Sequence, residues 1–365
     1  MCSSGAKRLS LPELVPPETP GAALLDEIRE QPAALRRLLA HETEFADVAA
    51  EASRTNRTLV RLVAHGSSDN AASYGVYAFG LLPGWTALRD SISLTVYSDA
   101  KLDHTGSCVL ALSQSGRTPD VVEYVSRARA QGALTVAVTN DPDSDLGLAA
   151  EAVLPLAAGP EQSIAATKTY VNTVAALALL AAHAAGRGKE FADGVARVAD
   201  LIDEALPALE SAVAELAVSF AFVGRMFVIG RGTELATARE IALKLLETCR
   251  IAAEPMTATA FAHGPVAALD ALFPVWAIAS RDENLQAVRE AVFRARAAGA
   301  GVVASGAAAG ELDASFRLPT PEPPLPLLSP LLSVLPGQLF ARALALAKGY
   351  DPDHPQGLQK VTLAR

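Results

Sequence analysis

The sequence predicts an α/β protein of two tandem domains, each a parallel sheet flanked by helices. Short apolar runs alternate with helical stretches from about residue 58 onward, which is the pattern of parallel strands joined by helical crossovers. The order strand, glycine turn, helix recurs in each half of the chain. With 365 residues, of which 50% are hydrophobic and 19% charged, the chain can bury two cores of ordinary size.

The first half begins with residues 1–20, which are predicted to form a loose tail. Residues 24–40 have helical periodicity, and Pro32 indicates a break or the start of a new helix. An alanine-rich helix is predicted over residues 168–186. Three nearly continuous apolar runs are predicted to be strands buried on both faces: residues 58–64, 107–113 and 134–140.

The second half repeats this order at an offset of 166 residues, measured between Gly66 and Gly232 (232 − 66 = 166). Both glycines follow a predicted strand and precede a predicted helix. The segments 110–138 and 276–304 also match and share the pattern Arg-Ala-Arg-Ala-x-Gly-Ala. Duplication of one α/β domain is the simplest account of these matches.

The end of the chain departs from the repeat. A proline-rich segment over 318–332 leads to a last predicted helix at 337–349 and a polar tail. We therefore expect four parts along the chain: an N-terminal tail and helix at 1–44, a first domain at 45–195, a second domain at 196–345 and a C-terminal tail at 346–365.

Composition argues against several classes of function. The formal net charge of −9 disfavours a general nucleic-acid-binding protein, because phosphate backbones require a basic surface. The three cysteines form no CxxC pair, and none of the six histidines lies at zinc-site spacing from another. We therefore predict no metal site and no nucleic-acid partner.

No targeting or membrane segment is expected. The first twenty residues are polar and proline-rich, unlike a signal peptide. Two alanine- and leucine-rich runs come nearest to membrane spans, but His183 interrupts the first, and prolines, Gln338 and Arg342 interrupt the second. We therefore expect a soluble cytoplasmic protein without a membrane partner.

The stretch 113-SQSGRTPD-120 carries the clearest indication of a ligand. It joins a predicted strand to a predicted helix, and a helix N-terminus there offers unpaired N–H groups and a positive dipole end. Gly116 allows the backbone to approach a ligand closely. Side-chain donors for a phosphate come from Ser113, Gln114, Ser115 and Thr118. The alternative is an ordinary polar turn.

Two comparisons within the chain sharpen this prediction. The equivalent loop of the second half, 280-SRDENLQ-286, carries Asp282 and Glu283, which would repel a phosphate, so only the first half is expected to keep an anion site. The pattern GxxxxGK(S/T) does not occur, and the turn 230-GRGTEL-235 lacks the third glycine of a dinucleotide fingerprint. We therefore expect neither nucleotide hydrolysis nor a dinucleotide cofactor, and no other cofactor is predicted.

Seven stretches together carry a resemblance to a known family. The chain resembles the double SIS (sugar isomerase) proteins, specifically the isomerase half of glucosamine-6-phosphate synthase and the SIS-type glucosamine-6-phosphate deaminases. The resemblance implies two SIS domains, each a flavodoxin-like three-layer sandwich. The stretches are 26-DEIREQP-32, 65-HGSSDNA-71, 113-SQSGRT-118, 159-GPEQSIAATKTY-170, 243-LKLLE-247, 263-HGP-265 and 351-DPDHPQGLQKVT-362.

The resemblance implies roles for four residues that carry proton or imine chemistry. Glu247 matches the family's proton-transfer carboxylate, and Lys244 lies three residues earlier on the same helix face. By spacing alone, Glu247 and Lys244 could instead form a surface ion pair, with Arg250 nearby. His263 matches the ring-opening histidine, which in relatives comes from the neighbouring subunit and so implies a homodimer with a shared active site. Lys360 matches a tail lysine that forms an imine or assists ring opening, although it could also be a solvated terminal lysine.

The resemblance also implies a substrate-binding set and two departures from it. Gly66, Ser67 and Ser68 match contacts to the sugar or its phosphate, and a loop containing Ala165, Ala166 and Thr167 matches one that lines the sugar. Ala166 replaces a serine of the synthase, and Ala260 replaces a glutamate of many relatives, so the pocket is expected to be roomier. Arg117 is unusual beside the phosphate loop and could add a charge-assisted contact.

Three functions follow from a bound sugar 6-phosphate. A carboxylate that removes the C2 proton supports deamination or aldose–ketose isomerisation of an amino-sugar 6-phosphate, which we take as the leading hypothesis. Loss of the C3 hydroxyl would instead make the protein a dehydratase, a lyase acting on N-acetylglucosamine 6-phosphate. A sensor that binds the sugar phosphate without reaction is the third. The synthase's glutaminase domain is not matched, and Cys2 is expected to be an incidental tail residue.

Overall fold

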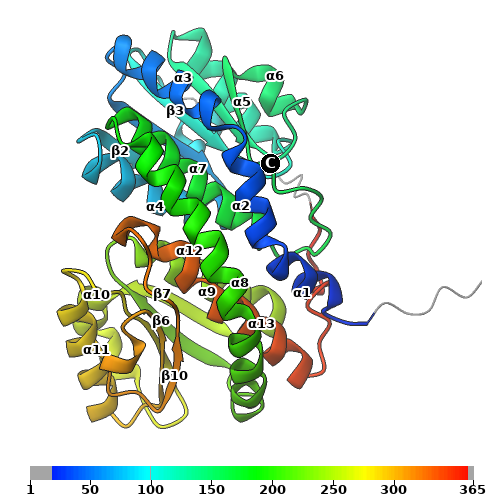
Figure 1. Cartoon of the computed structure of the whole chain (residues 1–365), viewed down its shortest axis with the longest axis vertical. Coiled ribbons are helices and arrows are strands. Elements are labelled where there is room, and N and C mark those ends of the chain that lie inside the picture. Colours follow the sequence, from blue (N-terminus) through cyan, green and yellow to red (C-terminus); the bar gives the residue numbers. More distant parts are fainter. Residues whose placement is uncertain (1–18, 99, 361–365) are drawn as a thin grey trace, which may run out of the picture.

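The predicted two-sheet architecture is confirmed in a computed structural model of the chain (Figure 1). The structure describes residues 19–98 and 100–360, so Cys2 and most of the predicted N-terminal tail lie outside the described residues. The described part contains two five-stranded parallel sheets, in the orders β2-β1-β3-β4-β5 and β7-β6-β8-β9-β10. The equivalent strands take the same places in both sheets, as duplication of one domain requires.

The elements of the first sheet begin where the apolar runs predict. Its strands are β1 (Leu59–Ala64), β2 (Thr86–Arg89), β3 (Ser107–Leu112), β4 (Leu134–Thr139) and β5 (Ala152–Pro155). Its helices are α4 (Gly66–Leu81), η1 (Ser93–Tyr97), α5 (Pro119–Ala130), α6 (Asp145–Ala149) and α7 (Lys168–Ala184). Every residue of β3 and β4 is buried, as predicted, whereas β1 is only partly buried at Leu59, Arg61 and Ala64.

The second sheet contains β6 (Arg225–Gly230), β7 (Ala252–Thr257), β8 (Val275–Ile278), β9 (Val302–Gly306) and β10 (Phe316–Pro319). The helices around it are α9 (Glu234–Cys249), α10 (Ala258–Ala262), η2 (Pro265–Ala268), α11 (Leu285–Ala297), η3 (Ala309–Glu311), η4 (Pro326–Leu328), α12 (Ser329–Ser333) and α13 (Leu335–Ala347). The predicted last helix is therefore present, starting two residues earlier than expected.

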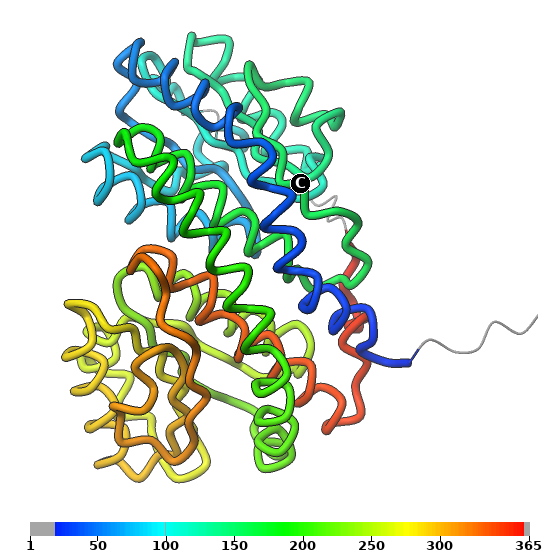
Figure 2. Tube along the Cα trace, viewed as in Figure 1, coloured from blue at the N-terminus to red at the C-terminus, as the bar shows by residue number. Residues whose placement is uncertain are grey.

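Four further helices join the halves: α1 (Ala22–Arg29), α2 (Gln31–Leu39), α3 (Glu42–Arg54) and α8 (Gly188–Ser219). Pro32 lies in the first turn of α2, where its fixed φ suits a new helix, as its position in the sequence predicts. Helix α8 runs along both halves and passes through the division drawn between residues 195 and 196 (Figure 2).

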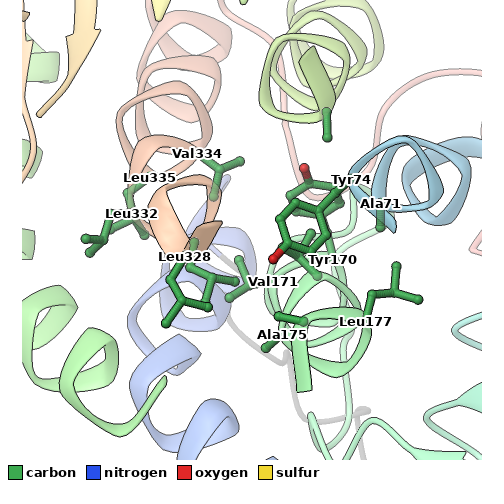
Figure 3. Close-up of a cluster of buried hydrophobic side chains, with 14 of the residues drawn as sticks. Ala71, Tyr74, Tyr170, Val171, Ala175, Leu177, Leu328, Leu332, Val334 and Leu335 are labelled. Atoms are coloured by element: carbon green, nitrogen blue, oxygen red, sulfur yellow. The ribbon is translucent and has the colours of Figure 1, made fainter. Parts of the chain in front are cut away.

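The core between the halves is built from helices of both. Side chains of α4, α7 and the segment from η4 to α13 meet there, with Tyr74 and Tyr170 side by side between α4 and α7 (Figure 3). By length and composition, Pro326–Ala347 could cross a membrane, contrary to the expectation drawn from its prolines. Within the protein, however, 78% of its most apolar stretch is buried in this core.

The C-terminal segment returns to the N-terminal helices (Figure 2). Asp353 is buried and accepts hydrogen bonds from Ala23 N at 3.2 Å and Leu24 N at 2.8 Å, in the first turn of α1. These bonds satisfy amides that a helix leaves unpaired at its start. They hold the chain so that the residues up to Lys360 reach the first half.

Candidate active site

A cavity of about 500 Å³ opens at the carboxyl ends of β1 and β3, where the strand order of the first sheet reverses. This is the place at which open parallel sheets bind their ligands. Both halves and the C-terminal segment contribute to its wall, and ten of the fourteen predicted site residues line it. Those ten are Gly66, Ser67, Ser68, Ser113, Gln114, Ser115, Thr118, Ala166, Glu247 and Lys360.

The loop 113–118 is folded as a compact cradle before α5. Ser113 Oγ lies 3.2 Å from Thr118 Oγ1 and accepts a hydrogen bond of 3.2 Å from Gly116 N. Gly116 has a φ of 62°, and a Cβ there would lie 1.9 Å from Ser144 Oγ, so the loop requires glycine at this position. Because the cradle is held by its own bonds, it can receive an anion with little reorganisation.

A row of charged residues on α9 brings one of its members, Glu247, to the cavity. Glu240, Lys244 and Glu247 are spaced by four and three residues, so they share one helix face. Lys244 Nζ lies 2.7 Å from Glu247 Oε2 and 3.3 Å from Glu240 Oε1, and it donates to Ser67 Oγ at 3.2 Å. Ser67 in turn donates to Glu240 at 2.9 Å. This network ties α9 of the second half to the start of α4 in the first.

Burial shifts the pKa values of Lys244 and Glu240 in this row. Burial by itself lowers the pKa of Lys244, but the carboxylates of Glu240 and Glu247 outweigh it and hold that pKa above its usual range. Burial raises the pKa of Glu240, which has no exposed surface. The side chain of Glu247 keeps 21% of its surface exposed and lines the cavity, so of the two carboxylates it is the one open to a ligand.

The structure rules out the simple surface ion pair that spacing alone allowed. Lys244 is buried, and Arg250 turns away from Glu247 to donate to Gln356 at 2.7 Å and to stack over the Tyr350 ring. Lys244 itself does not line the cavity. It contacts Glu247 from the buried side, with Nζ 2.7 Å from Oε2.

Lys360 lies in the cavity wall rather than in solvent. Its Nζ donates to Glu161 Oε2 at 2.8 Å and to Ser163 O at 2.6 Å. Glu161 is buried, and although burial opposes it, Lys360 and the amide of Thr167 hold the pKa of Glu161 below its usual value. The loop predicted to line the sugar is held by these bonds. Ala166 faces the cavity, whereas Ala165 and Thr167 are fully buried behind it.

Three further residues that the sequence assigned to the site do not line the cavity of this chain. His263 is exposed at the end of α10 in the second half, and Ala260 is exposed on the same helix. Arg117, expected to add a contact to the phosphate, places its guanidinium 3.3 Å from Asp141, and its side chain is 63% exposed. Arg117 is therefore paired with Asp141 and does not line the cavity.

Sequence reasoning missed four polar residues around the cavity. Glu240 could have been found from its place four residues before Lys244, and Glu161 lies within 159-GPEQS-163, where it was assigned no role. His65 begins the motif 65-HGSSDNA-71, and Asp120 follows the motif 113-SQSGRT-118. Only the contact between the two side chains in space identifies them as site residues. His65 Nε2 lies 2.9 Å from Asp120 Oδ2, and both residues line the cavity.

The equivalent crevice of the second half is smaller and acidic. It measures about 310 Å³ and is lined by Gly232, Thr233, Asp282 and Glu283 among others. Burial raises the pKa of Asp282. Nearby, the buried Glu234 carboxylate accepts hydrogen bonds from four hydroxyl groups: those of Thr237, Ser280, Ser329 and Ser333. These four hydroxyl groups of the second half are therefore already paired with a carboxylate of the chain itself.

No group of three or more His, Cys, Asp or Glu side chains suited to a metal ion occurs within residues 19–98 and 100–360. Cys108 and Cys249 are buried thiols, and burial raises the pKa of each, to about 12 and about 11. Neither thiol lines the cavity.

Known proteins resemble this chain over most of its length. The model of the family described as "SIS domain" matches residues 56–183 and 220–348. The glutamine–fructose-6-phosphate aminotransferase (isomerizing) of Mycolicibacterium smegmatis is 34% identical, over 92% of this chain and 56% of that protein. The chain thus spans about half the length of the curated relatives it matches.

Solved structures agree with the fold. One from Silicibacter pomeroyi DSS-3, described provisionally as a phosphosugar isomerase, is 34% identical with a TM-score of 0.81, covering 91% of this chain and 99% of that one. The C-terminal domain of glucosamine-fructose-6-phosphate aminotransferase from Francisella tularensis is 25% identical with a TM-score of 0.84, covering 93% of this chain and all (100%) of that one.

Proposed function

Because this chain belongs to the SIS domain family, we propose that its cavity binds an amino-sugar 6-phosphate and moves the proton on the sugar's C2 carbon. The leading form of this proposal is a glucosamine-6-phosphate deaminase and aldose–ketose isomerase, working as a cytoplasmic homodimer. One observation carries it. A hydroxyl-rich cradle from the first half and the Glu247 carboxylate from the second face the same 500 Å³ cavity.

The two walls suit the two ends of such a substrate. The cradle of loop 113–118 and the first residues of α4 offer hydroxyl and backbone donors to the phosphate. The cavity then extends to Glu247, which is placed to meet the carbons at the other end of an open-chain hexose. A base beside a carbonyl is the requirement for removing the acidic proton at C2.

The proposed reaction begins with ring opening, in which the hydroxyl proton on O1 is removed and a proton is delivered to the ring oxygen. His263 lies outside the cavity of its own chain, so we propose that a second copy brings it to this site, as the family resemblance implies. Lys360 would need to leave Glu161 and lose its proton before it could form an imine with a ketose.

Glu247 then takes the proton from C2, and the electron pair forms an enol between C1 and C2. Return of a proton to C1 leaves an imine at C2 when the substituent there is an amine. Addition of water and departure of ammonia give fructose 6-phosphate. When the substituent is a hydroxyl group, the same steps give aldose–ketose isomerisation.

One observation favours a second candidate. Ala166 lines the cavity where the synthase carries a serine, so the sugar side is less polar and has room for an N-acetyl group. An acetylated amine leaves poorly, and the C3 hydroxyl could then depart as water, which would make the protein a dehydratase of N-acetylglucosamine 6-phosphate. A third candidate is a sensor that binds the sugar phosphate and performs no reaction.

Product analysis distinguishes these candidates. The protein is incubated with glucosamine 6-phosphate or N-acetylglucosamine 6-phosphate, and ammonia, fructose 6-phosphate and ultraviolet-absorbing dehydration products are measured. Glu247→Gln should lower turnover by about 100-fold or more while leaving substrate affinity nearly unchanged. Glu215→Gln, a change on the exposed face of α8, is the matched control and should be fully active.

Deuterium exchange provides a readout that does not depend on the product. In heavy water, the C2 proton of either substrate should exchange with wild-type protein and not with Glu247→Gln. Tight binding without exchange or product would favour the sensor. Full activity in Glu247→Gln would overturn the proposed mechanism.

A further inference from the structure

The phosphate cradle has hydroxyl groups but lacks a cation of its own that faces the cavity. Arg117, the only charged base of loop 113–118, pairs with Asp141 in solvent. Lys360 lines the cavity but is bound to Glu161 and to Ser163 O. A phosphate ester carries up to two negative charges, and a charge-assisted hydrogen bond contributes about twice as much as a neutral one.

His65 stands beside the cradle at the place where such a cation is missing. It follows β1, and Ala64 pairs with Leu112 of β3, so His65 and Ser113 leave neighbouring strands side by side. Both residues line the cavity. The His65 side chain is 55% exposed, so it is open to a ligand in the cavity.

A buried carboxylate orients the His65 ring. His65 Nε2 lies 2.9 Å from Asp120 Oδ2, and Tyr97 donates its hydroxyl to the same oxygen at 3.1 Å. The Asp120 side chain is only 7% exposed. Its bond to Nε2 leaves Nδ1, which has no hydrogen-bond partner among the described residues, as the ring nitrogen that can donate to a ligand when both ring nitrogens carry a proton.

The charge of Asp120 supports the same assignment. Asp120 lies in the first turn of α5, whose N-terminus contributes to the cradle, and its Oδ1 is buried without a hydrogen-bond partner in the described structure. A carboxylate so close to a bound phosphate would repel it unless a cation offsets the charge. The His65 ring lies against this carboxylate, and in its cationic form it can face the anion at the same time.

We propose that His65, oriented by Asp120 and Tyr97, is the cationic group that binds the phosphate of the substrate. The inference rests on the proposed function, because it assumes that the cavity binds a phosphate ester. It adds to that function a residue that selects phosphorylated sugars over neutral ones. Asp120 and Tyr97 act as positioning residues, since they reach the ligand only through the imidazole ring.

Calorimetric titration tests this assignment. Fructose 6-phosphate, inorganic phosphate and fructose are titrated at pH 6.5 and constant ionic strength into the wild-type chain and into His65→Gln, Asp120→Asn, Arg117→Gln and Lys189→Gln. The change His65→Gln should weaken both phosphate-bearing probes by about tenfold, equal to about 1.4 kcal/mol. Asp120→Asn should weaken them by a smaller factor. Arg117→Gln removes the full charge of the same loop and should change either affinity by less than about threefold, and the matched control Lys189→Gln removes the charge of a side chain that is 86% exposed on α8.

The outcomes separate this inference from the proposed function. If the wild-type chain binds neither phosphate probe, the proposed function fails and the role of His65 fails with it. If the wild-type chain binds fructose 6-phosphate but not fructose, and His65→Gln binds it equally well, only the role of His65 is overturned. Equal losses in His65→Gln and Arg117→Gln would point to general charge and overturn it too. Thermal melting checks that each variant is folded.

Discussion

Replacing Lys244 by methionine should test how the active-site wall is held together. Lys244 Nζ lies 3.3 Å from Glu240 Oε1 and 2.7 Å from Glu247 Oε2. Glu247 can turn to water, but Glu240 has no exposed surface and would become an unpaired buried charge. Breaking a buried pair in this way destabilises a protein by about 3–5 kcal/mol. We expect Lys244→Met to lose stability in this range at pH 7.5.

The loss should shrink in acid, because Glu240 can escape the penalty by taking up a proton. Its pKa is already raised by burial, and removal of Lys244 raises it further. The variant therefore binds this proton more tightly when folded than when unfolded, so its stability falls as pH rises through the folded pKa. Lys244→Met should be closer to wild type at pH 5 than at pH 7.5.

Urea unfolding followed by circular dichroism measures these differences. The double variant Lys244→Met/Glu240→Gln should recover most of the loss, since a neutral amide can keep hydrogen bonds to Ser67 and Asn70 without carrying a charge. The matched control Lys189→Met removes a lysine whose side chain is 86% exposed and should change stability by less than about 0.5 kcal/mol. The reasoning is refuted if Lys244→Met loses less than about 1 kcal/mol, or if the double variant is no more stable than the single one.

Two further predictions concern the loops of the site. Burial and the neighbouring Glu161 raise the pKa of Glu27 from 4.5 to about 7. The protonated Glu27 side chain therefore stabilises the folded chain by about 3 kcal/mol. This stabilisation is complete below about pH 4.5 and is lost as the pH rises through 7. Glu27→Gln should flatten the decline of the urea midpoint between pH 5 and 8, and an unchanged slope would contradict the assignment. Gly116→Ala should abolish measurable binding of fructose 6-phosphate, because the new Cβ would meet Ser144 Oγ at 1.9 Å in a backbone with φ of 62°. Gly310→Ala, which meets no atom within 4 Å, should bind normally in the same titration.

Much of the fold follows from local patterns in the sequence. The strands β3 and β4 are continuous apolar runs, and this is what burial on both faces of a parallel sheet requires. Pro32 starts α2 because proline suits the first turn of a helix. The repeat between the halves predicts that both sheets have the same strand order, and they do.

The parts of the candidate site that are contiguous in the chain were also predicted, and other parts were missed. Loop 113–118 was found because strand end, glycine and helix start are contiguous in the chain. Glu240 and Glu161 were missed because a buried carboxylate is indistinguishable from a surface one in a sequence. Arg117 was given a contact with the phosphate, but its guanidinium lies 3.3 Å from Asp141 and does not line the cavity.

The sequence by itself determined the two α/β halves and the hydroxyl-rich cradle, since each depends on residues close together in the chain, whereas Glu247 on α9 was identified through the family resemblance. Tertiary structure alone decided that His65 meets Asp120, that Lys360 meets Glu161, and that Glu240 is buried against Lys244 and Ser67. These partners are brought together by the packing of the two halves and of the returning C-terminal segment. Burial then sets their charges, because the cost of removing a charge from water depends on everything packed around it.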